Sequence, residues 1–394
     1  YNFKKMLIEL SEFNIKLLIP LIFPIFKRIG DFSKKAYVKK DNQQFKVFRY
    51  FLSYTLCFIP FLIIKLRTKN SNTKNQDLKN TINEADDGPL TKSGEVNKLL
   101  KKKERRKKIK NIIFISILSI IGLFSNYYRY FFQKYESEYT KQSLGIFCDI
   151  FEYSALTYFI LKQKLFKHHF ISSGIITFVL LILFIITLFY INGRDIIPSF
   201  LFYFFLSLCF GTYDVLGKKY MEIFFSSPYF LMFIIGIINV SFLLIFEIFI
   251  YFLKSDIDGI IVGFNNNLTS VSKYFIFILD IIVKFINNIG IWLTVYYLTP
   301  CHYFISSYIS QYAYYIQEII EKNNEFYSVI NGVIFSVAFI INFFCCLVFN
   351  EVIILNFCGL DYNTKKRINQ RVNNDNYGFN IEMCETFDKE EELE

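Results

Sequence analysis

Charged residues are scarce in this sequence, and the sequence motifs of most enzyme classes are missing from it. Asp, Glu, Lys and Arg make up 20% of the 394 residues, against about 25% in an average soluble protein. The eight cysteines include no Cys-x-x-Cys pair, the spacing typical of zinc ribbons and redox sites. A Gly-rich phosphate loop, a nucleophile elbow and a His-Glu-x-x-His motif are absent as well. We therefore expect no enzyme, no cofactor and no metal centre.

The sequence is instead rich in long apolar runs. Hydrophobic residues make up 53% of the chain and the mean hydropathy is +0.33. A helix of about 20 apolar residues crosses the hydrocarbon core of a bilayer, and helices are expected there because lipid satisfies no backbone hydrogen bond. The sequence therefore predicts an all-α, polytopic membrane protein. Nine spans are expected at 48–66, 111–131, 143–161, 170–191, 198–216, 229–253, 272–298, 301–320 and 328–350, with a shorter tenth at 15–26.

The polar segments between these runs predict an orientation. Residues 67–110 are polar, are expected to be a disordered loop, and end in KKKERRKKIK just before a span. Such a basic cluster is typical of the cytosolic side of a membrane, where it faces anionic lipid. The net charge of +10 is thereby explained by the bilayer, and no nucleic-acid partner is expected. Asn267 begins an Asn-Leu-Thr glycosylation pattern on the face expected to be non-cytosolic.

Ten spans divide into two sets of five, 15–191 and 198–350, followed by a cytosolic tail at 351–394. Because five is odd, the second set enters the membrane from the opposite side. The layout predicts an inverted repeat, a common transporter construction with a binding site near the bilayer midplane.

Four stretches resemble a known group of membrane proteins, the drug/metabolite transporter superfamily, which contains nucleotide-sugar and triose-phosphate transporters. The stretch ALTYFILKQKLFKHHFISSGIITFVLLILFI resembles the junction of its fourth and fifth helices. SFLFYFFLSLCFGTYDVLGKKYM, YLTPCHYFISSYIS and NEVIILNFCGLDYNTKKRI resemble the start of its second half, the start of its ninth helix and the tail of uncharacterised solute-carrier-like members in single-celled eukaryotes and fungi. The resemblance implies ten helices, cytosolic termini, an endomembrane location and exchange of organic solutes, without naming a substrate.

One span carries charge at its centre. In IFILDIIVKFINNIGIW, residues 276–292, Asp280 and Lys284 lie four residues apart and share a helix face, which Asn287 and Asn288 continue. A charge at the bilayer centre costs at least about 2.5–3.5 kcal/mol, so this face is expected to point into the protein. Two interpretations stay open: a structural ion pair, and a site that binds substrate or protons. In either case, neutralising one partner is expected to harm the protein more than neutralising both.

Three further spans offer groups for the same interior surface. They are Tyr128 and Arg129 on 111–131, Asp149, Glu152 and Tyr153 on 143–161, and Ser307, Gln311 and Tyr314 on 301–320. Each set also has a simpler explanation, because arginines reach the interface, span ends are solvated and small hydroxyls serve helix packing.

A few charged or titratable groups lie near the ends of spans. Lys218 and Lys219 are interpreted as topology determinants, while Glu247 has no local partner in the sequence. His168 and His169 lie in the short connection at 162–169 and are expected at the membrane interface. A metal site there would need further ligands, which the sequence does not supply beside them.

Two functional hypotheses follow. The first is a secondary transporter of a small organic solute, with an anionic solute as one option. The second is a membrane scaffold or trafficking partner, which the basic loop and the acidic end CETFDKEEELE would serve as docking segments. The membrane expected is the Golgi, the endoplasmic reticulum or a vacuole or lysosome, with the plasma membrane and a homodimer left open.

Overall fold

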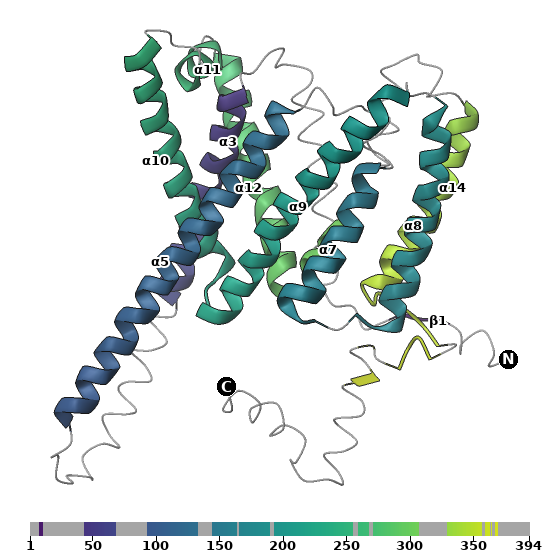
Figure 1. Cartoon of the computed structure of the whole chain (residues 1–394), viewed down its shortest axis with the longest axis horizontal. Coiled ribbons are helices and arrows are strands. Elements are labelled where there is room, and N and C mark those ends of the chain that lie inside the picture. The colour runs from purple at the N-terminus through teal and green to yellow at the C-terminus, as the bar shows by residue number, and fades with distance from the viewer. Residues whose placement is uncertain are drawn as a thin grey trace.

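The protein is a bundle of long helices (Figure 1) in a computed structural model. The structure describes residues 8–10, 43–67, 93–132, 144–163, 165–189, 193–254, 259–267, 271–306, 329–356, 359–362, 364 and 367–368. In chain order, its helices are α3 (Gln43–Thr55), α5 (Ser93–Phe131), α7 (Ile146–Leu161), α8 (Lys167–Leu188), α9 (Gly193–Phe224), α10 (Pro228–Lys254), α11 (Ile260–Asn267), α12 (Val271–Tyr297) and α14 (Val329–Phe349).

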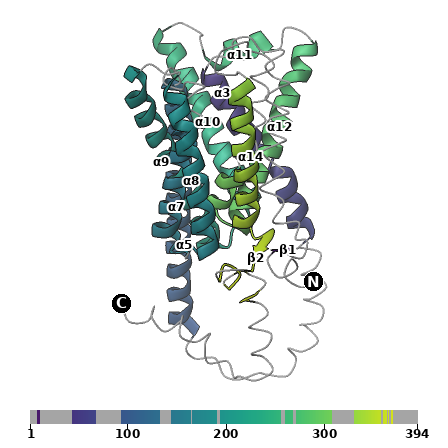
Figure 2. The same ribbon diagram turned by 90° about the vertical axis from the view of Figure 1, so that its right-hand side faces the viewer.

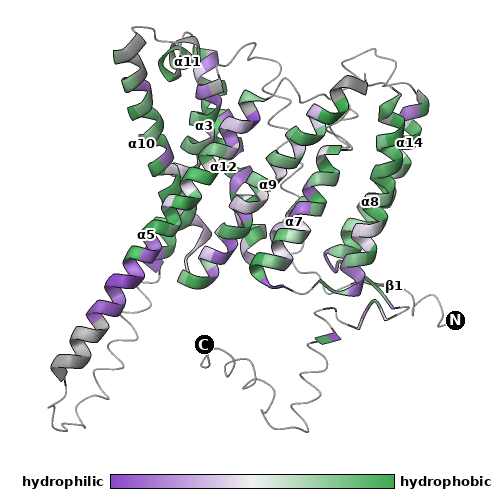
Figure 3. Cartoon of the chain, viewed as in Figure 1, coloured by the Kyte–Doolittle hydropathy of each residue, from purple (hydrophilic) through white to green (hydrophobic). Residues whose placement is uncertain are grey.

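Seven helices in the described part of the chain are long and apolar enough to cross a membrane. They cover Gln44–Arg67, Lys101–Arg129, Lys167–Ile186, Ile196–Phe224, Pro228–Phe249, Lys273–Tyr297 and Ile330–Phe349. Figure 3 colours most of their residues as hydrophobic, and many large side chains such as Phe170, Phe178 and Ile245 are exposed. Exposed apolar surface of this extent is what a bilayer would cover. The expected all-α membrane architecture is confirmed at this level.

Of the other three expected spans, two are described at least in part and one lies outside the described residues. The span at 143–161 is present as α7, whose 16 residues are fewer than the usual length of a spanning helix. Residues 300–306 are helical, but the rest of the span expected at 301–320 lies outside the described residues, as does 15–26.

The first described span bends where a proline enters it. Pro60 has no N–H, so Leu56 cannot receive the usual helical hydrogen bond from position 60. The chain tightens there, with Cys57 N–H donating to the Tyr54 carbonyl at 3.0 Å and Ile59 N–H donating to the Leu56 carbonyl at 3.1 Å. Helical structure then resumes to Arg67.

The basic segment directly before the second span is helical, which corrects the expectation of a disordered loop for residues 93–110, while residues 68–92 lie outside the described residues. Helix α5 begins at Ser93, and every residue from Lys101 to Lys110 is exposed. Lys, Arg, Glu and Leu favour helix, and the apolar span supplies a nucleus from which the helix extends. At 1.5 Å per residue, residues 93–110 form a helical extension of roughly 27 Å before residue 111. Figure 3 shows the basic part of this extension, Lys101–Lys110, largely in purple.

Helix ends alternate between two faces of the bundle (Figures 1 and 2). The tail face holds the end of α7, the start of α8, residues 225–227 and a two-stranded antiparallel sheet. That sheet pairs β1 (Ile8–Leu10) with β2 (Ile353–Leu355), Ile8 opposite Leu355, a contact that nothing in the sequence reading predicts. The opposite face holds α11 and the start of α3, where a Cβ on Gly259 would touch both Glu247 and Gln44. Glu247 therefore lies beside Gln44 and Gly259.

The largest core cluster joins α3, α5, α9, α10 and α12 around Trp292, the only tryptophan of the chain. Glycines allow its helices to approach closely. A Cβ on Gly217 of α9 would lie 2.3 Å from the Trp292 ring, and one on Gly236 of α10 would lie 2.9 Å from the Thr55 backbone nitrogen. Small residues at helix contacts are typical of membrane bundles, because they let backbones meet.

Replacing Gly217 by alanine is therefore expected to destabilise the protein. The Trp292 ring is buried and must shift to admit the methyl group, and overpacking of this kind costs typically about 1–3 kcal/mol. The matched control is Gly174→Ala in α8, where a Cβ meets nothing within 4 Å and alanine should stabilise the helix by up to about 1 kcal/mol. Thermal unfolding in detergent, followed by circular dichroism, measures both; equal melting temperatures for the two variants would contradict the packing argument.

Candidate functional site

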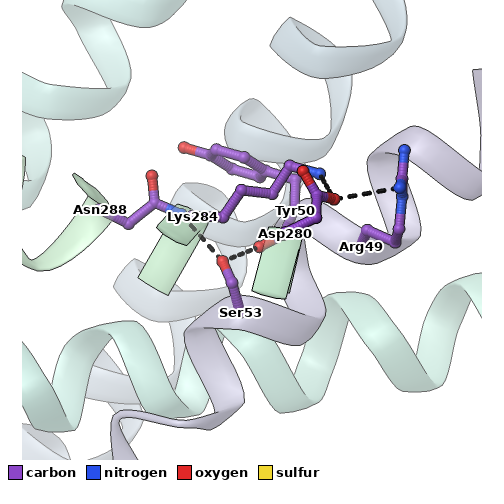
Figure 4. A network of polar contacts seen from close by, with 6 residues as sticks. All are labelled: Arg49, Tyr50, Ser53, Asp280, Lys284 and Asn288. Carbon is purple, nitrogen blue, oxygen red and sulfur yellow. Dashed lines mark hydrogen bonds and ion pairs between the residues drawn. The ribbon is translucent and has the colours of Figure 1, made fainter. Parts of the chain in front are cut away.

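Asp280 lies at the centre of a charged network between α3 and α12 (Figure 4). Its Oδ2 atom is 2.5 Å from Lys284 Nζ, one turn along α12, and 3.0 Å from a terminal guanidinium nitrogen of Arg49 on α3. Arg49 is 1% exposed. The carboxylate therefore binds two cations, one on each helix, in surroundings where unpaired charge is costly.

Neutral hydrogen bonds continue this contact along both helices. Asn288 Nδ2 donates to Ser53 Oγ at 2.9 Å, and Ser53 Oγ donates to the Tyr50 carbonyl at 2.6 Å. One turn further, Trp292 Nε1 donates to the Tyr54 hydroxyl at 3.1 Å. The contacting residues recur every four positions on α12, so a single stripe of that helix is polar.

A second polar group lies between α7 and α9. The Tyr153 hydroxyl donates to Asp214 Oδ2 at 2.9 Å, and the Ser207 hydroxyl donates to Asp149. Glu152 is 4% exposed, and neither of its carboxylate oxygens has a hydrogen-bond partner in the described part of the chain. An ionised carboxylate without a hydrogen-bond partner is costly to bury, because burial penalises charge.

Aromatic rings connect the two groups. Tyr213, the neighbour of Asp214 on α9, meets Trp292 edge-on with ring centroids 5.4 Å apart. On α3, the hydroxyls of Tyr50 and Tyr54 are 2.8 Å apart. Polar side chains of α3, α7, α9 and α12 thus lie on both sides of the Tyr213–Trp292 contact. We call the polar residues of the two groups together the interior polar surface: Arg49, Ser53, Asp280, Lys284 and Asn288 between α3 and α12, and Asp149, Glu152, Tyr153, Ser207 and Asp214 between α7 and α9.

The structure brings some of the predicted residues together and leaves others apart. Asp149, Glu152, Tyr153, Asp280, Lys284 and Asn288 belong to the interior polar surface. Asn287 is also buried, and its Oδ1 has no hydrogen-bond partner among the described residues. Ser307, Gln311 and Tyr314 lie outside the described residues.

Tyr128 and Arg129 lie on α5, a helix outside the four that form the interior polar surface. Tyr128 stacks on Phe202 at 5.9 Å and packs in an apolar cluster with Leu144 and Tyr203. Arg129 is half-buried near the end of α5.

Lys218 is less exposed than its interpretation as a topology determinant requires. Its Nζ donates to the Tyr296 carbonyl at 2.6 Å and lies 3.4 Å from Glu222, and the residue is 7% exposed. The lysine therefore ties α9 to the end of α12.

Arg49 and Ser53 escaped the sequence analysis. Arg49 is the second residue of the span expected at 48–66, a position typical of an interfacial anchor. Because α3 begins at Gln43, the arginine lies almost two turns inside the helix. The spacing of Arg49 and Ser53, four residues apart like Asp280 and Lys284, was the available signal.

A cavity of about 320 Å³ lies away from this surface. Its lining is apolar and comes from α7, α8 and α9, with Phe147, Phe184 and Phe200 among its residues. It offers a polar solute no hydrogen-bonding group.

Comparison with known proteins gives no family. No family model matches the chain, and no curated protein matches it. Among solved structures, a chain titled "Crystal structure of protein" is similar, with a TM-score of 0.49 and 7% sequence identity over 85% of this chain and 96% of that one.

The shared carboxylate revises the expectation for an isolated pair. Asp280→Asn removes the counter-charge of two cations and is expected to destabilise the protein by about 3–5 kcal/mol. Lys284→Met leaves the Arg49–Asp280 contact in place, and since the Lys284 side chain is 23% exposed, it should cost about 1 kcal/mol. The double variant should stay close to Asp280→Asn, because Arg49 still loses the carboxylate.

Thermal unfolding of the purified variants provides the measurement. Asp361→Asn serves as control, since it removes the carboxylate of a more exposed ion pair with Arg367, 3.2 Å long. Full recovery of stability in the double variant would show that Arg49 does not depend on Asp280.

Proposed function

We propose that the protein is a secondary transporter of a small organic solute, built like the drug/metabolite transporters with ten spans in a five-plus-five inverted repeat. The observation that carries the proposal is the interior polar surface, where ionisable groups from four helices lie inside a largely apolar bundle. Ionisable groups at membrane depth are rare because they are costly, and they mark substrate or ion pathways.

The two halves of the surface suggest separate tasks. The Arg49–Asp280–Lys284 network offers cationic groups that an anionic group of a substrate could engage by exchanging with Asp280. Glu152, with Asp149 one turn away, offers a carboxylate that can take up and release a proton as its surroundings alternate between buried and wet. Proton movement would then be coupled to movement of the solute by alternating access.

The proposal is tested by purified protein in liposomes, with a panel of anionic, zwitterionic and neutral metabolites and an imposed pH gradient. Accumulation of one solute class above that in empty liposomes supports it. If the protein carries nothing across such a panel, the scaffold alternative gains. That alternative is favoured by one observation, the exposed basic part of α5 from Lys101 to Lys110.

Glu152→Gln is expected to preserve folding and abolish the response of transport to the pH gradient. Glutamine keeps the shape of the protonated carboxyl, so expression and melting temperature should remain near those of the unmodified protein, while the side chain can no longer release a proton. Glu222→Gln is the control, because that carboxylate is 47% exposed and should leave transport unchanged. A normal gradient response in Glu152→Gln would rule out this residue as the coupling group.

The proposed orientation places the tail face in the cytosol and the end of α11 on the other side. A cysteine introduced at Lys103 should react with an impermeant thiol reagent from the cytosolic side, and one at Asn267 only after the membrane is opened. Both are compared in a background whose native cysteines are replaced. Labelling of position 267 from the cytosol would reverse the orientation without affecting the transport proposal.

A further inference from the structure

The three histidines of the chain lie together on the tail face. His168 and His169 occupy the first turn of α8, and their ring centroids are 4.0 Å apart. His302, from the helical stretch at 300–306, meets the His169 ring edge-on at 5.6 Å. His168 and His169 are 3% and 6% exposed.

Glu351 brings a carboxylate to the same place from the end of α14. Its Oε1 is 3.5 Å from His168 Nε2, and one ligand atom from each of His168, His169 and Glu351 lies within 4.8 Å of the others. Glu351 could not be predicted as a third ligand from the sequence, because it lies far along the chain from His168 and His169.

The backbone of Glu351 supports a specific role for its side chain. Its φ angle is 58°, in the left-handed region. The Val352 N–H donates to the Leu347 carbonyl at 2.9 Å and the Glu351 N–H to the Val348 carbonyl at 3.1 Å, which is the helix ending where glycine is usual at the left-handed position. A non-glycine residue is strained there, and such strain concentrates at functional sites.

The donor set suits a metal ion. Two imidazole nitrogens and a carboxylate oxygen are ligands of Zn²⁺, at about 2.0–2.2 Å in a tetrahedron, which leaves a fourth position for water. Ligand atoms of such a tetrahedron are roughly 3.3 Å apart, close to the 3.5 Å between His168 and Glu351. His169 Nδ1 accepts the Phe166 N–H at 3.1 Å, so this nitrogen carries the lone pair, and a metal bound there would replace that hydrogen bond.

We propose that His168, His169 and Glu351 bind a divalent transition-metal cation of the Zn²⁺ type, which fastens the start of α8 to the end of α14. The site lies directly before β2, so the metal would also fix the segment that pairs with β1. The proposal stands independently of transport.

The test uses the full chain, purified with an affinity tag that contains no histidine and stripped with a chelator. Zn²⁺, Co²⁺ and Mg²⁺ are titrated separately, with the melting temperature and the visible absorption of tetrahedral Co²⁺ as readouts. Zn²⁺ should raise the melting temperature at one equivalent, since it binds the folded state, and Mg²⁺ should not.

Glu351→Gly and His168→Ala should each weaken Zn²⁺ binding by at least about 10–100-fold. Loss of a residue that only hydrogen-bonds to a metal ligand already lowers metal affinity by this factor. Glu351→Gly is the sharper variant, since glycine suits the left-handed backbone and the metal-free protein should stay folded. Asp361→Asn, a carboxylate change on the same face, should bind like the unmodified protein. Equal Zn²⁺ affinity in the unmodified protein and both ligand variants, or no saturable binding at all, overturns the proposal.

Discussion

The structure depends on the cost of leaving a charge without a counter-charge in apolar surroundings. Asp280 meets this constraint by binding Arg49 on one helix and Lys284 on its own. With Arg49 almost fully buried, separating α3 from α12 would strand charges at several kcal/mol each. The position of α3 is therefore fixed by its ion pair with α12 as well as by apolar packing.

Close packing follows from that fixed position. Once α3 and α12 are joined, the Tyr54 hydroxyl lies against Trp292 Nε1, and Trp292 reaches the space that Gly217 leaves on α9. Gly236 gives α10 the same close approach to Tyr54. In lipid, where apolar burial alone does not drive helices together, such backbone proximity and interhelical hydrogen bonds hold the bundle.

The sequence predicts the helices better than it predicts their partners. Run length and hydropathy locate each described span, because both are local properties. The face of α12 that carries Asp280 and Asn288 is also predictable from helical spacing. The partners of Arg49 and Glu351 could not be assigned, since Asp280 and His168 are distant from them in the sequence, although the four-residue spacing of Arg49 and Ser53 marks a polar helix face. The helix over 93–110 was missed because its composition resembles a disordered segment, and the continuity with an apolar span decided the outcome.

The helices that form the interior polar surface are held together by contacts of different kinds. Hydrogen bonds and ion pairs between α3 and α12 are directional and fix those helices to each other, and the Tyr153–Asp214 bond does the same for α7 and α9. Between these two pairs, the Tyr213–Trp292 contact is an edge-to-face aromatic pair, while Lys218 donates to a backbone carbonyl near the end of α12. Each helix pair is thus joined internally by ion pairs or hydrogen bonds, and α9 is joined to α12 through the rings of Tyr213 and Trp292 and through Lys218.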